Sequence, residues 1–515
     1  MAGADLQPEC DAMMEKSRNQ LEQDSDPNSP EHFDVLIIGA GISGIDAAYH
    51  LGKLRPGTGY AILEAGSKIG GTWVTHTFPG VRSDSDLFTF GFSWKPWTGV
   101  PIGTGAEILQ YLNEAVAEND IGRNIRFNLR IEMAEWSSTT QRWTLTLRRG
   151  EDVTPTKMTC GFLWMCAGYF RHAKGFTPDW PTISAYKGQV IHPQNWPEDL
   201  HYTGKHVVVI GSGATAATLV PALAEKAAHV TMIQRSPTYY YPRPTMDAFN
   251  TMLSKLDLPA EWYHEIMCRH FLLISQTTRK RSLEEPEALA ADLIGAARKY
   301  LGDDYDIATH FTPKYMPWRQ RLAMIPDGDF YIAIREGKAE VLTDQIECFT
   351  ETGLRLQSGK DVAADIIVTA TGLTMCLFGD IVVEVDGQRF DPAQSTTHLG
   401  IMFTGLPNFA AVFGYLRSSW TLRADLFSRH VCRLLDYMDA QRTTSVTPTL
   451  REEDRDMPHK PWIEPENFNP GQVMRSLDTY PRQGDRQPRI IGRSRRDNGR
   501  LSFEHDHRIG KGRCA

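Results

Sequence analysis

Two stretches of this 515-residue chain repeat one pattern of apolar and polar positions. An apolar run, a glycine-rich turn and an amphipathic stretch follow one another in residues 33–51 and again in residues 206–223. Each stretch is followed by a second short apolar run, at residues 60–64 and 230–234. A strand, a turn, a helix and a strand in this order open a doubly wound domain with a mainly parallel sheet. The chain is therefore predicted to have an α/β fold with two dinucleotide-binding domains.

The rest of the chain supplies the connections and extensions around these two domains. Residues 247–314 show helical spacing, residues 365–371 (DIIVTAT) have the character of a strand, and residues 419–438 are predicted to form a helix. Periodicity is lost after residue 443, and the basic stretch from residue 489 is expected to be disordered. The predicted division is an N-terminal disordered extension (1–30), a first domain (31–175 and 360–445), a second domain (176–245 and 315–359), a helical insertion (246–314) and a largely irregular C-terminal extension (446–515).

Composition narrows the classes of function. The formal net charge of −8 offers no general attraction to a nucleic-acid backbone. The eight cysteines are scattered without metal-ligand spacing, which favours reduced thiols, no metal site and a cytoplasmic protein. The longest apolar run, residues 401–416, is interrupted by glycine and proline, and the N-terminus lacks the apolar core of a signal peptide. We therefore expect no transmembrane segment. The sequence leaves both a monomer and a homodimer open.

The first glycine-rich turn has the chemistry of a phosphate cradle. Gly39, Gly41 and Gly44 stand in GxGxxG spacing directly after the strand DVLII. The first glycine allows the tight turn, the second lets the backbone approach a pyrophosphate, and the third packs the helix on the strand. The helix N-terminus then offers free N–H groups to the phosphates. Glu64, at the end of the next strand, is predicted to accept hydrogen bonds from a ribose, and Ser43 lies within the same motif.

The second turn, GSGATA, differs at the end of the following strand. Gly211, Gly213 and Ala216 take the three glycine positions, but the next strand ends in Gln234-Arg235 instead of an acid. A carboxylate would repel a ribose phosphate, whereas the guanidinium of Arg235 can bind it with several donors. This difference favours NADPH in the second domain. The acid Glu64 after the second strand of one domain and Arg235 at the same place in the other predict FAD in the first domain and NADPH in the second, with hydride passing between them.

Two longer motifs resemble those of a known family. Residues 186–197, YKGQVIHPQNWP, are similar to the fingerprint of Baeyer–Villiger monooxygenases, FxGxxxHxxxW followed by Pro or Asp, with Tyr186 in place of Phe. Residues 70–84, GGTWVTHTFPGVRSD, are similar to the second family signature, GGxWxxxxFPGxxxD. The likeness extends over residues 33–471, and residues 83–97, SDSDLFTFGFSWKPW, are similar to the ethionamide-activating subgroup of these class B flavoprotein monooxygenases. Trp196 favours this family over the heteroatom-oxidising flavin monooxygenases, which usually have Tyr or Phe there.

The resemblance implies roles for individual residues. Asp84 matches the aspartate beside the flavin, Arg321 the arginine that stabilises a flavin peroxide, and His192 a linker residue that couples domain motions. Many members have Lys where this chain has Gln320, so the NADPH phosphate is expected to lose one contact unless Arg319 or Lys314 replaces it. The further cofactor residues that we expect are Ser43, Thr72, Trp73, Asp84 and Ile131 for FAD, and Ser212, Ala214, Thr215 and Ser236 for NADPH.

The resemblance also implies a reaction. Reduced flavin would capture O2 as a peroxide, which adds to a ketone to give an ester or lactone, and the same enzyme would oxidise some sulfides. Two alternatives stay open from the residues alone: a monooxygenase that oxidises only sulfur or nitrogen, and an NADPH oxidase that releases hydrogen peroxide. Taken alone, Arg321 and Asp84 lie in charged runs typical of a solvated surface, so their assignment depends on the two motifs. The side chains that the sequence shows do not identify the substrate.

Overall fold

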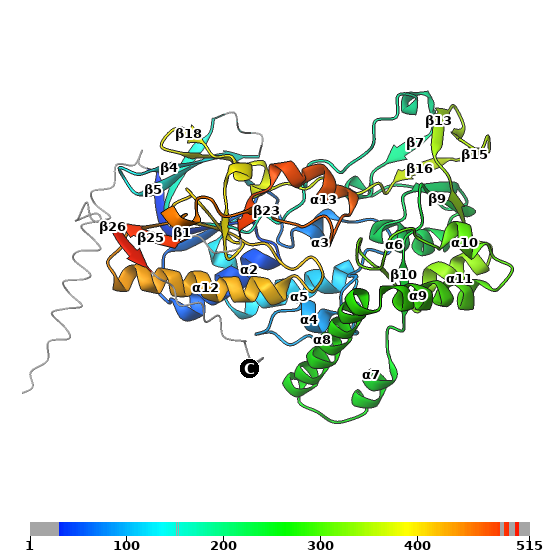
Figure 1. Cartoon of the computed structure of the whole chain (residues 1–515), viewed down its shortest axis with the longest axis horizontal. Helices are drawn as coiled ribbons and strands as arrows, with labels where there is room; N and C mark the ends of the chain where they lie inside the picture. Colours follow the sequence, from blue (N-terminus) through cyan, green and yellow to red (C-terminus); the bar gives the residue numbers. More distant parts are fainter. Residues whose placement is uncertain (1–29, 151, 153, 485–488, 494–499, 504–515) are drawn as a thin grey trace, which may run out of the picture.

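The computed structural model describes residues 30–150, 152, 154–484, 489–493 and 500–503. The expected N-terminal extension therefore lies almost entirely outside the described residues. Two sheet-based domains lie side by side, and a group of helices projects beneath the second of them (Figure 1). This arrangement confirms the predicted α/β fold with two dinucleotide-binding domains. No helix within the described ranges is both long and apolar enough to cross a membrane.

The first domain is built on a sheet that has nine strands in the described part of the chain, in the order β18-β17-β4-β5-β6-β1-β2-β3, with β21 beside β6. Its central strand β1 is buried on both faces, because Val35 and Ile37 join one core cluster while Leu36 and Ile38 join another. The strands are β1 (Glu31–Ile38), β2 (Tyr60–Leu63), β3 (Ile125–Arg126), β4 (Leu129–Ser137), β5 (Arg142–Arg149), β6 (Thr156–Met165), β17 (Val382–Val385), β18 (Gln388–Arg389) and β21 (Phe409–Ala411).

Helices cover one face of this sheet. The long helix α12 packs along α2 (Figure 1). The predicted helix 419–438 thus corresponds to α12, displaced by two residues at each end. The helices of this domain are α2 (Ile42–Leu54), α3 (Thr72–Thr75), α4 (Leu87–Phe90), α5 (Gly105–Glu118) and α12 (Thr421–Ala440), and the two-stranded hairpin β19 (Thr397–His398) and β20 (Met402–Phe403) precedes β21.

The second domain contains a parallel sheet of five strands among the described residues, in the order β12-β9-β8-β16-β7. Strand β16 pairs with β8 and β7, so the DIIVTAT segment belongs to this sheet. The expected return to the first domain at residue 360 was therefore wrong, because the chain crosses back only after Gly372. The main elements are β7 (Gln189–Ile191), β8 (His206–Ile210), α6 (Ala214–Ala224), β9 (His229–Gln234), α11 (Asp329–Arg335), β12 (Ala339–Thr343) and β16 (Ile366–Thr369).

Smaller elements complete the second domain and the insertion. Residues 246–314 are helical, as the sequence predicts, and α8 reaches back to contact α4 of the first domain. The insertion contains α7 (Ala248–Leu253), α8 (Ala260–Glu284), α9 (Pro286–Leu301) and α10 (Ile307–His310). The smaller strands are β10 (Tyr240–Arg243) with β11 (Ala323–Pro326), and the antiparallel group β13 (Ile346–Thr350), β14 (Gly353–Leu356) and β15 (Asp361–Ala363).

The C-terminal extension is more ordered than its composition suggests. It includes β22 (Ser445–Thr449), β23 (His459–Pro461), α13 (Gly471–Ser476), β24 (Arg482–Gly484), β25 (Arg489–Arg493) and β26 (Arg500–Phe503). Strand β25 pairs with both β22 and β26, so disorder from residue 489 was wrong for these two segments, and the remainder of the basic tail lies outside the described residues. These strands have only three to five residues each, which is too short for a period to show in the sequence.

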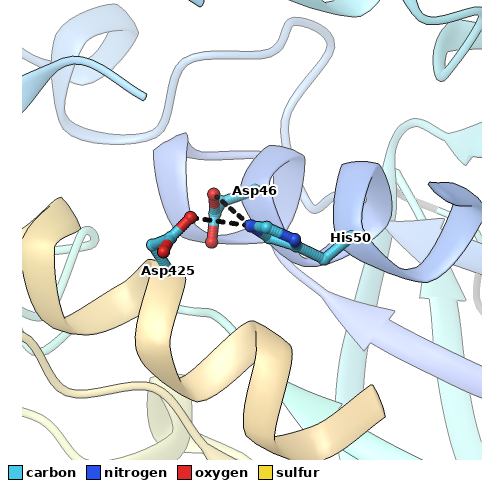
Figure 2. A group of neighbouring side chains, drawn as sticks. All are labelled: Asp46, His50 and Asp425. Carbon is cyan, nitrogen blue, oxygen red and sulfur yellow. Dashed lines mark hydrogen bonds and ion pairs between the residues drawn. The ribbon is translucent and has the colours of Figure 1, made fainter. Parts of the chain in front are cut away.

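A buried polar cluster joins α2 to α12. His50 Nε2 lies 2.8 Å from Asp425 Oδ1 and 3.6 Å from Asp46 Oδ1 (Figure 2). The Asp46 carboxyl also accepts hydrogen bonds from the indole of Trp94 at 3.1 Å and from the hydroxyl of Ser428 at 2.7 Å. Asp46 and His50 lie on α2, and Asp425 and Ser428 lie on α12, so the cluster is a structural link between the two helices. Buried polar groups that are satisfied in this way fix a unique packing.

The cluster gives a pH-dependent prediction for Asp46→Asn. Burial raises the pKa of Asp46 to about 6. Because the folded protein holds this proton more tightly than the unfolded chain, the corresponding stabilisation is present below about pH 4 and is lost as pH rises through about 6. The asparagine variant lacks this titration. Its free energy of unfolding relative to wild type should rise by about 2.4 kcal/mol between pH 4 and pH 7.

Urea denaturation at a series of pH values measures this difference. Asp120→Asn is the control, since the side chain of Asp120 is 70% exposed. The control should show a difference from wild type that is nearly constant with pH. A constant difference for Asp46→Asn as well would contradict the prediction.

Candidate active site

A single large cavity brings both glycine-rich turns together. Its volume is about 1340 Å³, more than the ~300–1,000 Å³ typical of a site for one small ligand. Every predicted cofactor residue except Gly44 and Ala216 lines it, as do Asp84 and Arg321. The lining residues from the sequence-based set are Gly39, Gly41, Ser43, Glu64, Thr72, Trp73, Asp84, Ile131, Gly211, Ser212, Gly213, Ala214, Thr215, Arg235, Ser236 and Arg321.

The first turn is shaped as a dinucleotide cradle requires. Gly39 has φ +100°, and a Cβ there would lie 2.9 Å from the carbonyl oxygen of Cys166. A Cβ on Gly44 would lie 1.9 Å from the carbonyl oxygen of Gly39, so this glycine holds α2 against β1. Gly41 is the N-cap residue of α2, and because it has no side chain, no capping side chain covers the N–H groups at the start of this helix. The free N–H groups at this helix start thus face the cavity and fit a pyrophosphate.

Glu64 lies at the end of β2, beside this cradle. Its two carboxylate oxygens accept hydrogen bonds from the backbone N–H groups of Ala40 and Gly66, each at 2.7 Å. Each oxygen has a second lone pair available, and the residue lines the cavity. The carboxylate is therefore held in a fixed orientation in which it can still accept from the hydroxyls of a ribose.

The second turn repeats the geometry with one difference. Gly211 has φ +126°, and a Cβ there would meet the carbonyl oxygen of Ala370 at 2.2 Å. A Cβ on Gly213 would meet nothing within 4 Å, so the start of α6 is open to a ligand. Arg235 and Ser236 follow β9 on the same cavity, both exposed. The guanidinium of Arg235 has no acidic partner among the described residues and is free to bind a phosphate.

Asp84 and Arg321 form a bidentate ion pair at the cavity. Arg321 Nη2 donates to Asp84 Oδ1 at 2.7 Å, and Arg321 Nε lies 2.6 Å from Asp84 Oδ2. The charge of Asp84 is the main cause that raises the pKa of Arg321 above its ordinary value. The residues are 237 positions apart, so the fold brings together two side chains that the sequence could associate only through the family motifs. The arginine remains 39% exposed, toward the cavity that it lines.

His192 and Trp196 lie in the connection between the domains and do not line the cavity. His192 Nε2 is 3.1 Å from the carbonyl oxygen of Gly372, and its ring fills the space beside Gly175. Burial lowers the pKa of this histidine. Trp196 packs on the core of the second domain next to Tyr202. This location is suited to transmitting domain motion and does not bring the imidazole to the reacting atoms.

Sequence reasoning missed an aromatic wall, which we define as Tyr169, Phe170, Phe176, Trp420 and Phe468. The rings of Tyr169 and Trp420 stack with centroids 4.9 Å apart. The indole N–H of Trp420 donates to the hydroxyl of Ser43 at 2.7 Å, so the wall is connected to the first cradle. One signal was present: Tyr169 lies four residues after the end of β6, and ligands of such folds bind beyond the carboxyl ends of the strands.

The C-terminal extension also contributes to the site, against expectation. Phe468 and residues 470–473 line the cavity. Arg475 from α13 lies over the ring of Phe176, 3.5 Å from its centroid, and donates to the carbonyl oxygen of Leu373. No periodic pattern could have revealed this contribution, because the segment is held by contacts to residues distant in the chain.

Comparison with known proteins agrees with this geometry. Residues 104–255 match the flavin-binding monooxygenase-like family model, and residues 37–98 match the NAD(P)-binding Rossmann-like domain model. The chain is 43% identical to the FAD-containing monooxygenase EthA of Mycobacterium tuberculosis over 491 residues, which cover 92% of this chain and 98% of EthA. The chain belongs to the class B flavin monooxygenases. This membership confirms the expected flavin-dependent monooxygenase.

Another relative supports the assignment, and one solved structure is similar in fold. The chain is 40% identical to the probable FAD-binding monooxygenase AlmA of Acinetobacter baylyi, over 92% of this chain and 96% of that protein. The crystal structure of OTEMO in complex with FAD and NADP is similar in fold, with a TM-score of 0.68 and 22% identity over 83% of this chain and 88% of that one.

Proposed function

We propose that this class B monooxygenase binds FAD in the first domain and NADPH in the second, and inserts one oxygen atom of O2 into a ketone to give an ester or lactone. The observation that carries the proposal is the bidentate Asp84–Arg321 pair on a cavity that both cradles share. The open helix starts behind Gly41 and Gly213 fit two pyrophosphates. The relative EthA is an FAD-containing monooxygenase, and the crystal structure of OTEMO contains FAD and NADP.

The residues of the chain have distinct tasks in this reaction. A bound reduced flavin supplies the activation of O2. The permanently charged guanidinium of Arg321 stabilises negative charge that develops on oxygen at the cavity. Asp84 holds that guanidinium at the cavity and offsets its charge when no anion is present. The aromatic wall gives the cavity an apolar side, and an apolar surrounding strengthens these interactions.

The test uses purified holoenzyme with NADPH and air. An aryl ketone and the corresponding aryl sulfide are offered separately, and the products are identified by mass spectrometry. We expect an ester from the ketone. Sulfoxide from the sulfide, with only hydrogen peroxide from a broad set of ketones, would replace the proposal with a heteroatom monooxygenase. Peroxide alone in every case would indicate an NADPH oxidase.

Arg235 gives a second test of the cofactor assignment. Arg235→Ala should raise the KM for NADPH by about 10- to 100-fold, because a charge-assisted contact to phosphate contributes ~1.5–3 kcal/mol. The KM for NADH, which lacks that phosphate, should change little. Steady-state kinetics with both coenzymes measure the ratio, and Arg235→Lys should retain part of the preference. An equal loss with NADPH and NADH would show that Arg235 does not contact the phosphate.

A further inference from the structure

One member of the aromatic wall, Trp420, makes a polar contact with the first cradle. Its indole N–H donates to the hydroxyl oxygen of Ser43 at 2.7 Å. Trp420 stands directly before α12, whereas Ser43 is the second residue of α2. The two residues are 377 positions apart, and both line the cavity. The contact therefore joins the wall of the cavity to the helix start that fits a pyrophosphate.

The indole determines which hydrogen-bonding role is left to the Ser43 hydroxyl. An indole N–H is a donor only, so the oxygen of Ser43 is the acceptor in this contact and its O–H proton has to be donated elsewhere. Serines inside helices often donate to the backbone carbonyl three or four positions earlier, here that of Ala40 or Gly39. Within the described ranges, the Ser43 hydroxyl makes no hydrogen bond besides the one from Trp420. Its proton is therefore available to a ligand.

Burial makes that available proton significant. Ser43 is only 5% exposed, and it lines the cavity beside the first cradle. A buried donor without an acceptor is unfavourable, so an acceptor that enters the cavity relieves this cost. The oxygens of a pyrophosphate are charged and only accept hydrogen bonds, which makes them suitable partners for the O–H group.

The ring of Trp420 is held in place by its neighbours. It stacks on Tyr169 with the ring centroids 4.9 Å apart and an angle of 14° between the planes. On the ring of Phe413 it packs at 5.6 Å. A Cβ on Gly414 would lie 2.4 Å from the indole, so the ring packs directly on the backbone at this glycine. These contacts restrict the orientation in which the indole N–H can point.

The backbone on both sides of Trp420 is also anchored. The hydroxyl of Ser419 is hydrogen-bonded to that of Thr89 at 2.5 Å, and the hydroxyl of Thr421 donates to the carbonyl oxygen of Phe90 at 2.8 Å. Both contacts fix the start of α12 to α4. The buried polar cluster shown in Figure 2 joins α12 to α2. The donor and the acceptor of the indole–hydroxyl contact therefore belong to one rigid arrangement of helices.

We propose that Trp420 is a positioning residue for FAD: its indole N–H holds the hydroxyl of Ser43 so that the O–H proton is directed to the pyrophosphate of FAD. The inference rests on the proposed binding of FAD in the first domain. A hydrogen bond to a charged phosphate oxygen is stronger than one between neutral groups. A hydroxyl that is already oriented also loses less freedom when the cofactor binds. Trp420 thus acts on the cofactor through Ser43.

A double-mutant cycle on the affinity for FAD tests this role. The full-length holoenzyme is diluted, and the rise of flavin fluorescence as FAD dissociates gives the Kd. Trp420→Phe keeps a stacked ring but removes the N–H, and should raise the Kd about 3- to 10-fold. Ser43→Ala should raise it about tenfold or more. Adding Trp420→Phe to Ser43→Ala should raise it no further, because both changes remove the same interaction.

Trp462→Phe is the matched control for the cycle. Trp462 also packs on Phe413, with centroids 4.4 Å apart, but it does not line the cavity. Its substitution should leave the Kd for FAD unchanged. An equal rise from Trp420→Phe in the presence and in the absence of the Ser43 hydroxyl would show that Trp420 acts through packing alone, and would overturn the inference. An unchanged Kd in either single variant would overturn it as well.

Phosphorus NMR of the bound FAD needs only the single variants and covers the case in which the double variant does not fold. We expect Trp420→Phe and Ser43→Ala to shift the same one of the two pyrophosphate resonances. Shifts of different resonances, or no shift in Trp420→Phe, would contradict the proposed role. Neither measurement uses NADPH or a ketone. A holoenzyme that gives both expected results and oxygenates no ketone would reject the proposed reaction and retain the role of Trp420.

Discussion

Replacing Arg321 with alanine is expected to lower the rate of ketone oxygenation by at least about 10²-fold, while NADPH still reduces the bound flavin. The guanidinium is held at the cavity by two contacts to Asp84 and carries a charge that no physiological pH removes. Its loss removes the stabilisation of negative charge on oxygen, which arises only after reduction. The two half-reactions should therefore respond differently to one substitution.

Anaerobic stopped-flow spectroscopy measures flavin reduction, and mass spectrometry measures the ester. Arg123→Ala is the control, since the side chain of Arg123 is 73% exposed and does not line the cavity. Asp84→Asn tests the partner: it keeps the shape but removes the charge that raises the pKa of Arg321, so an intermediate loss is expected. Ester formation at the wild-type rate by Arg321→Ala would refute the assigned role, and equal loss of both half-reactions would indicate damage to cofactor binding instead.

Replacing Gly44 with alanine is expected to prevent FAD binding and to destabilise the first domain by several kcal/mol. The added methyl group would lie 1.9 Å from the carbonyl oxygen of Gly39, a backbone atom that cannot move without opening the cradle. Overpacking of this kind typically costs ~1–3 kcal/mol, and displacement of α2 from β1 adds to it. The same helix also holds Asp46 and His50, which join it to α12.

Gly52→Ala provides a matched control in the same helix. A Cβ at Gly52 meets nothing within 4 Å, so alanine there should raise stability by up to ~1 kcal/mol through its higher helix propensity. Flavin absorbance per protein and the free energy of unfolding in urea distinguish the two variants. If Gly44→Ala purified with a full complement of flavin, the tight packing of α2 on β1 would not be needed for the site.

Several features were determined by the sequence alone because they depend on local order along the chain. The strand, glycine turn and helix at Gly39 and at Gly211 each form from neighbouring residues, and the steric need for glycine is local. The change from Glu64 to Arg235 after the second strand is likewise readable without a structure. The family motifs around Asp84 and Arg321 added residues whose chemistry no local pattern could show.

Other features were decided only by the tertiary structure. Strand β16 belongs to the second sheet, where it pairs with β7 and β8. These partners precede it by more than 150 positions, so the sequence could not show the pairing. The aromatic wall and the C-terminal side of the cavity are likewise assembled from segments that are distant in sequence. Such contacts depend on which surfaces the folded domains bring together, and hydrophobic periodicity carries no information about that. The sequence determined the two cradles, whereas the packing of the domains and the C-terminal extension determined what lies opposite them.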